Sequence, residues 1–465
     1  MRHIVFLNGI WPNDPKWPKI QFSRSISCYQ LKHWLSNYGF KSQVIDYCQI
    51  LSADEIFNLL EQFVSKDTFA IGVSTTFWPT DKNIPPNLRD SISRIKDKWP
   101  HLKIISGGAR KTWNPEFFDK HFVGESENQL LEWCQFQTGK SSLLNRKFDI
   151  VNLTHRFDNS DAILTNEALP IELGRGCIFK CKFCSHHNLG KSKFTYQRNF
   201  DNILDEITYN YENFGTTKYM FLDDTVNEDL DKIRNLSTVK ERTGINIEWT
   251  GYLRADLIWS KSESAELLLK SGLKSCFFGI ETFHPLAGRS IDKGWGSKHG
   301  KEYIPKLYKE LWNSNINIHV NLIAGLPSET IESLNESLEW CRSQDIGCHR
   351  FVPLTLYVEK NDTFASSEFT KNYSNYGYKN VNHETGYWES ETMTSKDAAK
   401  FCEDSQKILT LGNRVSSWEV FNGTNLGYET VDVMSWSYAT LKQIALDNEE
   451  KFKNRYLEKL TNLRN

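Results

Sequence analysis

Apolar and polar positions follow two different periods along the first 140 residues. Apolar runs of strand length occur at residues 3–9, 43–47, 69–74, 103–108 and 122–124. Longer stretches between them, such as residues 29–38 and 54–64, carry apolar residues at the spacing of a helix that buries one face. Gly39 suits the C-terminal cap of the first of these helices. Strands alternating with helices pair in parallel, so the pattern predicts an α/β fold whose N-terminal domain, residues 1–140, is a doubly wound parallel sheet.

The alternation stops at residues 141–168, which lack a clear period and which we interpret as a linker. It resumes over residues 169–357 with six strand-like runs, at residues 170–173, 219–222, 245–253, 275–280, 316–323 and 349–356. Helix-like stretches separate them, at residues 200–211, 229–241, 262–270, 301–313 and 329–341. Six units are too few to close an eight-stranded barrel, so we expect a partial (β/α) barrel with its ligands at the carboxyl ends of the strands.

Residues 358–465 are richer in Asn, Ser and Tyr and show less regular periodicity. Helices are predicted at residues 394–411, with Ser395 as the N-cap, and at residues 438–460. We expect a small, mainly helical C-terminal region that closes the barrel. Within it, Tyr387-Trp388-Glu389-Ser390 is expected to help define the substrate site.

Composition and charge exclude several classes of protein. The 465 residues include 39% hydrophobic and 25% charged residues, which is typical of a globular protein. The 56 Lys and Arg residues nearly balance the 58 Asp and Glu residues, which does not indicate a nucleic-acid partner. No apolar run approaches the roughly 18 residues of a membrane span, and the N-terminal run is too short for a signal peptide. We therefore expect a cytoplasmic protein without a membrane partner.

Three of the ten cysteines lie close together in a loop after the first barrel strand, at Cys177, Cys181 and Cys184. Three thiolates within eight residues can surround one soft-metal site. A 4Fe–4S cluster normally takes four thiolates, so three would leave one iron open to a chelating cosubstrate. The alternative is a zinc site with His186 or His187 as the fourth ligand, which would favour a non-catalytic interaction protein.

The spacing Cys-x3-Cys-x2-Cys, with Phe183 before the third cysteine, resembles the signature of the radical SAM superfamily. The resemblance implies that the methionine moiety of S-adenosylmethionine binds the open iron. One-electron reduction would then release a 5′-deoxyadenosyl radical, and Phe183 would pack near the adenine. It also implies an electron donor such as a flavodoxin or ferredoxin, and a small-molecule or peptide substrate.

Later strand ends also resemble segments of this family, at residues 221–224, 251–256, 278–282 and 321–330. The resemblance implies that Asp223 and Asp224 hold the methionine amino group or a ribose hydroxyl, although either carboxylate also suits a helix cap. Arg254 would bind the methionine carboxylate or an adenosyl hydroxyl. Glu281 is the expected ion partner of Arg254, which is also the pattern of a structural salt bridge. Gly325 would allow the backbone to approach the adenine.

The N-terminal pattern resembles the cobalamin-binding domain that precedes many radical SAM barrels, on residues 72–75, 105–108 and 123–127. Ser74, Gly107 and Gly108 would then lie at the cofactor. The first loop, residues 11–19, departs from the pattern because it lacks the histidine of Asp-x-His-x-x-Gly. That string occurs instead at residues 119–124, where we expect His121 to lie at the wrong end of the sheet.

Three alternatives follow from this departure: cobalamin binds without a histidine ligand, cobalamin is absent, or another small ligand takes its place. Bound cobalamin would favour a methyltransferase that acts on an unactivated carbon or phosphorus. Without cobalamin, a radical rearrangement, an oxidation or a bond-forming reaction is expected. The sequence singles out no catalytic acid, base or radical-relay residue.

Overall fold

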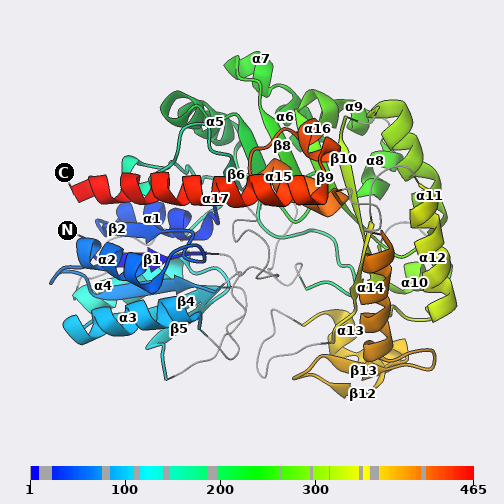
Figure 1. Ribbon diagram of the computed structural model, residues 1–465, viewed down its shortest axis with the longest axis horizontal. Coiled ribbons are helices and arrows are strands. Elements are labelled where there is room, and N and C mark those ends of the chain that lie inside the picture. The colour runs from blue at the N-terminus through cyan, green and yellow to red at the C-terminus, as the bar shows by residue number, and fades with distance from the viewer. Residues whose placement is uncertain are drawn as a thin grey trace. The chain divides into compact units, whose positions relative to one another are not determined.

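The computed structural model describes residues 2–9, 24–75, 84–108, 116–139, 147–185, 196–261, 263–293, 297–313, 315–344, 349–356, 366–409 and 415–464. The chain forms two compact units (Figure 1). The first comprises residues 1–170, 201–216 and 442–465, and the second comprises residues 171–200 and 217–441. The expected C-terminal region is thus divided, because its last helix belongs to the first unit.

The first unit is built on a five-stranded sheet in the order β2-β1-β3-β4-β5, with parallel neighbours. Helices α2 and α3 contact each other on this sheet, as do α1 and α4 (Figure 1). This confirms the predicted doubly wound fold. The strands are β1 (Ile4–Leu7), β2 (Ser42–Ile45), β3 (Ala70–Ser74), β4 (Lys103–Gly108) and β5 (Lys120–Val123). The helices are α1 (Ser27–Ser36), α2 (Ala53–Phe63), α3 (Pro86–Lys98), α4 (Glu127–Thr138), most of α5 (Phe200–Phe214) and most of α17 (Tyr438–Thr461).

Local chemistry explains where these elements begin and end. All residues of β1 and β3 are buried, as expected for central parallel strands covered on both faces. The residues of β2, at the edge of the sheet, are buried as well. Ser52 and Glu55 form a reciprocal capping box that begins α2. At Gly72 of β3, an added Cβ would lie 2.7 Å from the Phe6 ring, so only glycine fits beside β1.

The second unit contains a six-stranded sheet in the order β11-β10-β9-β8-β7-β6, with parallel pairs from β7 to β11, which confirms the predicted partial barrel. The strands are β6 (Leu169–Ile171), of which only Ile171 is counted in the second unit, β7 (Lys218–Phe221), β8 (Glu248–Leu253), β9 (Leu273–Glu281), β10 (Asn317–Ala324) and β11 (His349–Pro353). The helices are α6 (Leu230–Ser237), α7 (Val239–Thr243), α8 (Ala255–Ser260), α9 (Glu263–Lys270), α10 (Pro285–Ser290), α11 (Ser297–Lys306), α12 (Ile331–Ser343), α13 (Glu368–Lys371), α14 (Ser395–Leu409), α15 (Ser417–Asn425) and α16 (Thr430–Ser435).

Several elements of the second unit differ from the sequence-based expectation. Helix α14 begins at Ser395, and Thr394 is its cap, because the Thr394 hydroxyl accepts a hydrogen bond from Asp397 N at 3.3 Å. Strands β12 (Lys379–Asn382) and β13 (Tyr387–Glu389) form an antiparallel hairpin that was not predicted. Helix α15 was also missed; it packs on one face of the sheet, against strands β7 to β11. We call this face the α15 face.

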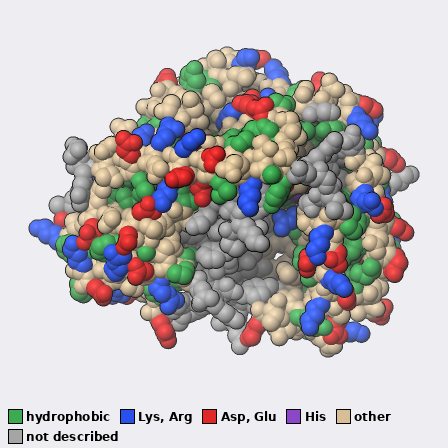
Figure 2. Space-filling model, viewed as in Figure 1, with side chains coloured by type: hydrophobic (Ala, Val, Ile, Leu, Met, Phe, Trp, Pro, Cys, Tyr) green, Lys and Arg blue, Asp and Glu red, His purple; other side chains and the backbone are tan. Residues whose placement is uncertain are grey.

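The surface carries both signs of charge. Lys and Arg side chains lie interspersed with Asp and Glu side chains over the described part of the face in Figure 2, as the nearly neutral composition predicts. Among the described residues, no helix combines the length and the apolar character that crossing a membrane requires.

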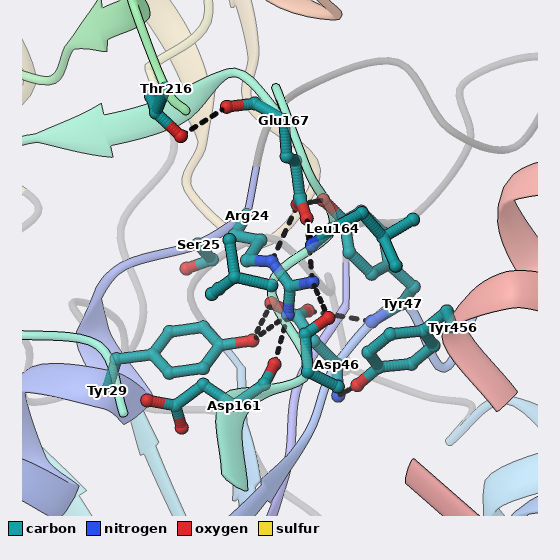
Figure 3. Close-up of polar contacts among 12 residues, drawn as sticks. Arg24, Ser25, Tyr29, Asp46, Tyr47, Asp161, Leu164, Glu167, Thr216 and Tyr456 are labelled. Carbon is teal, nitrogen blue, oxygen red and sulfur yellow. Dashed lines mark hydrogen bonds and ion pairs between the residues drawn. The ribbon is translucent and has the colours of Figure 1, made fainter. Parts of the chain in front are cut away.

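The first unit buries a cation, Arg24, which is 1% exposed (Figure 3). The guanidinium donates two hydrogen bonds to the Glu167 carboxylate, at 2.6 and 3.0 Å. It also donates to the Tyr29 hydroxyl at 2.7 Å and to the carbonyl oxygens of Asp161 and Ala162. Arg24 therefore connects the start of α1 to residues 161–167, with its charge paired and its donors used.

Helix α17 completes the surroundings of Arg24. The Tyr456 ring lies 5.2 Å from the guanidinium carbon, and the Tyr456 hydroxyl accepts a hydrogen bond from Asp46 N at 2.8 Å. Asp46 in turn accepts a hydrogen bond from the Tyr29 hydroxyl. Burial raises the pKa of Asp46, and Arg24 opposes this effect. The carboxylates of Asp46 and Glu167 thus depend on the same cation.

Replacing Arg24 by glutamine should destabilise the first unit strongly. Arg24→Gln leaves the Glu167 carboxylate buried without a cation, which typically costs about 3–5 kcal/mol. The measurement is urea unfolding of the full chain, followed by near-ultraviolet circular dichroism. Arg234→Gln is the control, because Arg234 forms exposed ion pairs with Asp231 and Glu263 and should change little. Equal unfolding midpoints for the two variants would contradict this role of Arg24.

Candidate functional site

The cysteine loop follows β6 and is fixed at several backbone positions. Gly176 has φ +80°, a left-handed conformation that glycine adopts without strain. An added Cβ at Gly174 would lie 3.0 Å from the Tyr196 carbonyl oxygen, so the chain can only pass there without a side chain. Lys182 N donates to the Ile291 carbonyl at 3.0 Å, and Cys184 N donates to the Cys181 carbonyl at 3.0 Å. These contacts hold the loop at the carboxyl end of the strand, as predicted.

None of the three predicted thiols forms a disulfide with a described residue, and Cys181 is 7% exposed. Burial raises the pKa of Cys177 and Cys181, whereas the positive charges of Lys293 and Arg254 lower the pKa of Cys181. Among the described residues, no three His, Cys, Asp or Glu side chains converge on a point where a single metal ion could bind. His186 and His187, the predicted fourth zinc ligands, lie outside the described residues.

Arg254 pairs with Asp256, not with the predicted Glu281. Its Nε and Nη2 atoms donate to the two Asp256 carboxylate oxygens at 3.0 and 2.6 Å. Asp256 lies in the first turn of α8, two residues after Arg254, where its oxygens match the guanidinium fork. The remaining nitrogen, Nη1, lies 3.7 Å from Cys181 Sγ, and the guanidinium carbon lies 3.9 Å from the centre of the Phe179 ring. Arg254 thus directs one donor at a cysteine of the motif.

Glu281 instead pairs with Lys293, at 2.5 Å between Oε1 and Nζ. Glu281 has φ +70°, and the register between β9 and β10 shifts next to it. An added Cβ at Gly279 would lie 2.4 Å from the Glu281 carboxylate and 2.8 Å from Lys293 Nζ, so the ion pair occupies the space beside this glycine. Lys293 was not predicted as a site residue, because it follows α10 outside any motif or periodic segment.

The two adjacent carboxylates of the second strand end have different surroundings. Asp223 is buried and accepts hydrogen bonds from Leu173 N at 2.9 Å and from Lys232. Neither carboxylate caps α6, because Asp229 does so. Asp223 therefore joins the ends of β6 and β7 to α6. Asp224 is half-buried, and its charge raises the pKa of Cys177 after the larger effect of burial. Asp224 is thus the carboxylate closer to the cysteine loop.

Gly325 is closely packed, but against this chain's own Trp388. With φ +99°, an added Cβ there would lie 2.5 Å from the indole ring. Gly325 N donates to Glu329 at 3.1 Å, and the Gly325 carbonyl accepts from the Tyr378 hydroxyl at 2.8 Å. Trp388 is fully buried and donates to the Leu354 carbonyl. Trp388 thus occupies the space beside the Gly325 Cα, and the predicted approach of the Gly325 backbone to an adenine stays a prediction.

The remaining predicted residues lie at the strand ends where they were expected. Phe183 lies in the cysteine loop, with its ring centre 5.8 Å from Lys293 Nζ. Ser74 ends β3, and Gly107 and Gly108 end β4, in the first unit. His121 lies within β5 and pairs with the Ser106 hydroxyl at 2.6 Å. It is therefore bonded inside the sheet, which fits the interpretation of its motif as coincidence.

Comparison with known proteins finds a family match that lies mostly in the second unit. Residues 171–341 match the family model of the radical SAM superfamily. A curated relative, the uncharacterized methyltransferase PH0819 of Pyrococcus horikoshii, is 25% identical over 185 residues. The match covers 39% of this chain and 38% of that protein, so it spans about two fifths of each.

Two solved structures share the fold of most of the chain. The radical S-adenosylmethionine methyltransferase TsrM of Kitasatospora setae is 17% identical with a TM-score of 0.55, over 76% of this chain and 73% of that one. The cobalamin-dependent S-adenosylmethionine radical enzyme OxsB is 18% identical with a TM-score of 0.55, over 80% of this chain and 55% of that one. TsrM has been solved with cobalamin and a 4Fe–4S cluster bound, and OxsB with aqua-cobalamin and S-adenosylmethionine.

The pKa of Glu329 should make the stability of the second unit depend on pH. Burial raises this pKa from 4.5 to about 7, although hydrogen bonds from Thr282, Leu326 and Gly325 oppose the shift. The folded state then binds the proton more tightly than the unfolded state, so stability falls as the pH rises from about 4.5 to about 7. The expected loss is about 3 kcal/mol, since the pKa rises from 4.5 to about 7 and one pKa unit is worth about 1.4 kcal/mol.

Glu329→Gln tests this expectation, because glutamine cannot ionise. Thermal unfolding of the full chain at pH 5 and pH 8 should show a smaller decrease for the variant than for the wild type. Glu339→Gln on the exposed side of α12, where Glu339 pairs with Arg342, is the control. An unchanged pH dependence in Glu329→Gln would show that Glu329 is ionised throughout this range.

Proposed function

We propose that this chain, whose residues 171–341 match the family model of the radical SAM superfamily, is a cobalamin-dependent methyltransferase. Its 4Fe–4S cluster would be held by Cys177, Cys181 and Cys184. The observation that carries the proposal is the fixed three-cysteine loop at the carboxyl end of β6, with a guanidinium nitrogen 3.7 Å from one thiol. Cationic donors next to thiolates suit an anionic cluster, because they offset its negative charge.

The residues present fit such a cluster and its cosubstrate. Three cysteines supply three of the usual four thiolates, which leaves one iron for S-adenosylmethionine. When bound, the cluster supplies the electron that cleaves S-adenosylmethionine to a 5′-deoxyadenosyl radical. Arg254 orients one donor toward Cys181, and Asp256 together with Phe179 holds it there. Phe183 and Asp224 are proposed to contact the adenosyl and methionine groups.

Methyl transfer is supported by the fold of the first unit and by the relatives. The five-stranded sheet has the order 2-1-3-4-5, whose switch point between β1 and β3 is a usual place for a cofactor. Ser74, Gly107 and Gly108 end the strands beside that point. A cobalamin-independent radical reaction is the second candidate, because the loop at residues 11–19 has no histidine for the cobalt.

Electron paramagnetic resonance of the anaerobically reconstituted, reduced full chain tests the proposal. We expect a 4Fe–4S signal that changes when S-adenosylmethionine is added, because the cosubstrate binds the open iron. Cys181→Ala should lose the signal, whereas Cys341→Ala, in α12 away from the motif, should keep it. One zinc per chain and no iron would support the alternative of a non-catalytic zinc protein.

The second cofactor is tested on the same samples. Protein incubated with hydroxocobalamin and desalted should retain the corrin absorbance if it is a cobalamin-dependent methyltransferase. A cluster signal without retained corrin would instead favour the cobalamin-independent reaction.

Arg254→Gln should lower the midpoint potential of the cluster. The substitution removes a positive charge and a donor near Cys181, so the reduced, more negative cluster is less stabilised. We expect a decrease on the order of 60 mV, which corresponds to about 1.4 kcal/mol for one electron. The measurement is a redox titration followed by electron paramagnetic resonance. Arg289→Gln, in α10, is the control; equal potentials in both variants would exclude this effect of Arg254.

A further inference from the structure

Side chains on the α15 face of the second sheet form layers that differ in their polar contacts. The first layer consists of Thr250, Ser275 and Asn317, near the amino ends of β8, β9 and β10. Asn317 donates to the Ser275 hydroxyl at 2.7 Å and to the Ser417 carbonyl at 2.9 Å, and Thr250 bonds Asn425. Helix α15 therefore closes this layer with hydrogen bonds.

The next layer along the strands is aromatic. Phe277 lies opposite Tyr252 on β8 and His319 on β10. The ring centres of Tyr252 and Phe277 are 5.0 Å apart, and Trp418 of α15 lies 6.0 Å from Phe277. Tyr252, Phe277 and Trp418 remain half-buried. Their rings leave a partly open apolar surface above the sealed layer.

The third layer, nearest the carboxyl ends, consists of Gly279, Asn321 and Arg350, which lie directly opposite one another on β9, β10 and β11. Asn321 and Arg350 are half-buried, and neither forms a hydrogen bond or ion pair with any described residue. The Arg350 guanidinium lies over Trp418, 5.5 Å from the ring centre. Polar groups in this position have their donors available to a ligand.

Arg350 is a cation of this layer that forms no ion pair with any described residue. Lys293, beside Gly279, is neutralised by Glu281. Burial raises the pKa of Glu419, and the positive charge of Arg350 opposes this effect. The Glu419 carboxylate accepts hydrogen bonds from Ser416 N at 2.7 Å and from the Ser416 hydroxyl, in the capping box that begins α15. Lys293 Nζ also lies 5.8 Å from the ring centre of Phe183 in the cysteine loop, so this layer lies at the same end of the sheet as that loop.

We propose that Arg350 and Asn321 bind a carboxylate or phosphate group of the substrate, whose apolar, preferably planar body lies against Tyr252, Phe277 and Trp418. The Arg350 guanidinium lies over the Trp418 indole, and its fork matches the two oxygens of a carboxylate or phosphate. Asn321 supplies an amide donor next to it. The assignment of this ligand as the substrate rests on the proposed radical SAM function; the anion site itself does not.

The test is a ligand-detected NMR titration of the reconstituted full chain with benzoate, phenyl phosphate and the neutral benzamide. We expect one or both anions to bind saturably and, where both bind, to compete for the same site. Benzamide should bind at least about tenfold more weakly. The relative affinities of benzoate and phenyl phosphate distinguish a carboxylate substrate from a phosphorylated one.

Variants assign the binding to this layer. Arg350→Gln should weaken the anions about tenfold while leaving benzamide unchanged, and Arg350→Lys should restore only part of the affinity because it lacks the fork. Arg342→Gln on exposed α12 is the matched control and should bind as the wild type. Circular dichroism checks that each variant is folded.

Two results overturn the proposal: no saturable binding of either anion, or equal anion affinity in Arg350→Gln and the wild type. Its failure is separate from that of the radical SAM function. The cluster signal of the same samples reports the function, and the titration reports the anion site.

Discussion

The parallel register of β9, β10 and β11 determines which side chains meet in the second unit. Gly279, Asn321 and Arg350 share one row because the strands are aligned at these residues. A slip of one residue would turn each of these side chains to the opposite face of the sheet. Immediately beyond the row the register shifts, and Glu281 takes a positive φ and pairs with Lys293. Aligned strands thus arrange the layers, and the local irregularity places a charge pair at their end.

Each of the two units buries a cation that is paired with a buried carboxylate. Arg24 with Glu167 and Lys232 with Asp223 are nearly inaccessible, and each cation has an acidic partner and further hydrogen-bond partners nearby. Removing one member of such a pair costs more than the pair contributes, since the other member stays charged and desolvated. The Lys232–Asp223 pair connects the ends of β6 and β7 to α6, and the Arg24–Glu167 pair connects the start of α1 to residues 161–167.

The periodicity of the sequence predicted both sheets, and the cysteine spacing predicted the loop that holds Cys177, Cys181 and Cys184. Local patterns carry this information because strand alternation and motif spacing are short-range. The partner of Arg254 was predicted wrongly, since Asp256 and Glu281 are both acidic and only the three-dimensional structure separates them. Lys293 and α15 were missed for the same reason: their roles come from contacts with residues far away in the sequence.

The contact between Tyr456 and Asp46 has a consequence for the order of events during translation. The two residues are 410 positions apart, yet Tyr456 completes the edge of the first sheet beside Arg24. During translation, β1 to β5 emerge from the ribosome long before α17 does. The edge of the first sheet that Tyr456 contacts is therefore uncovered while the barrel is synthesised. Such long-range closure slows folding and exposes the waiting edge to chaperones or to aggregation. The first unit is therefore completed only after α17 has been synthesised, when Tyr456 can contact Asp46 and Arg24.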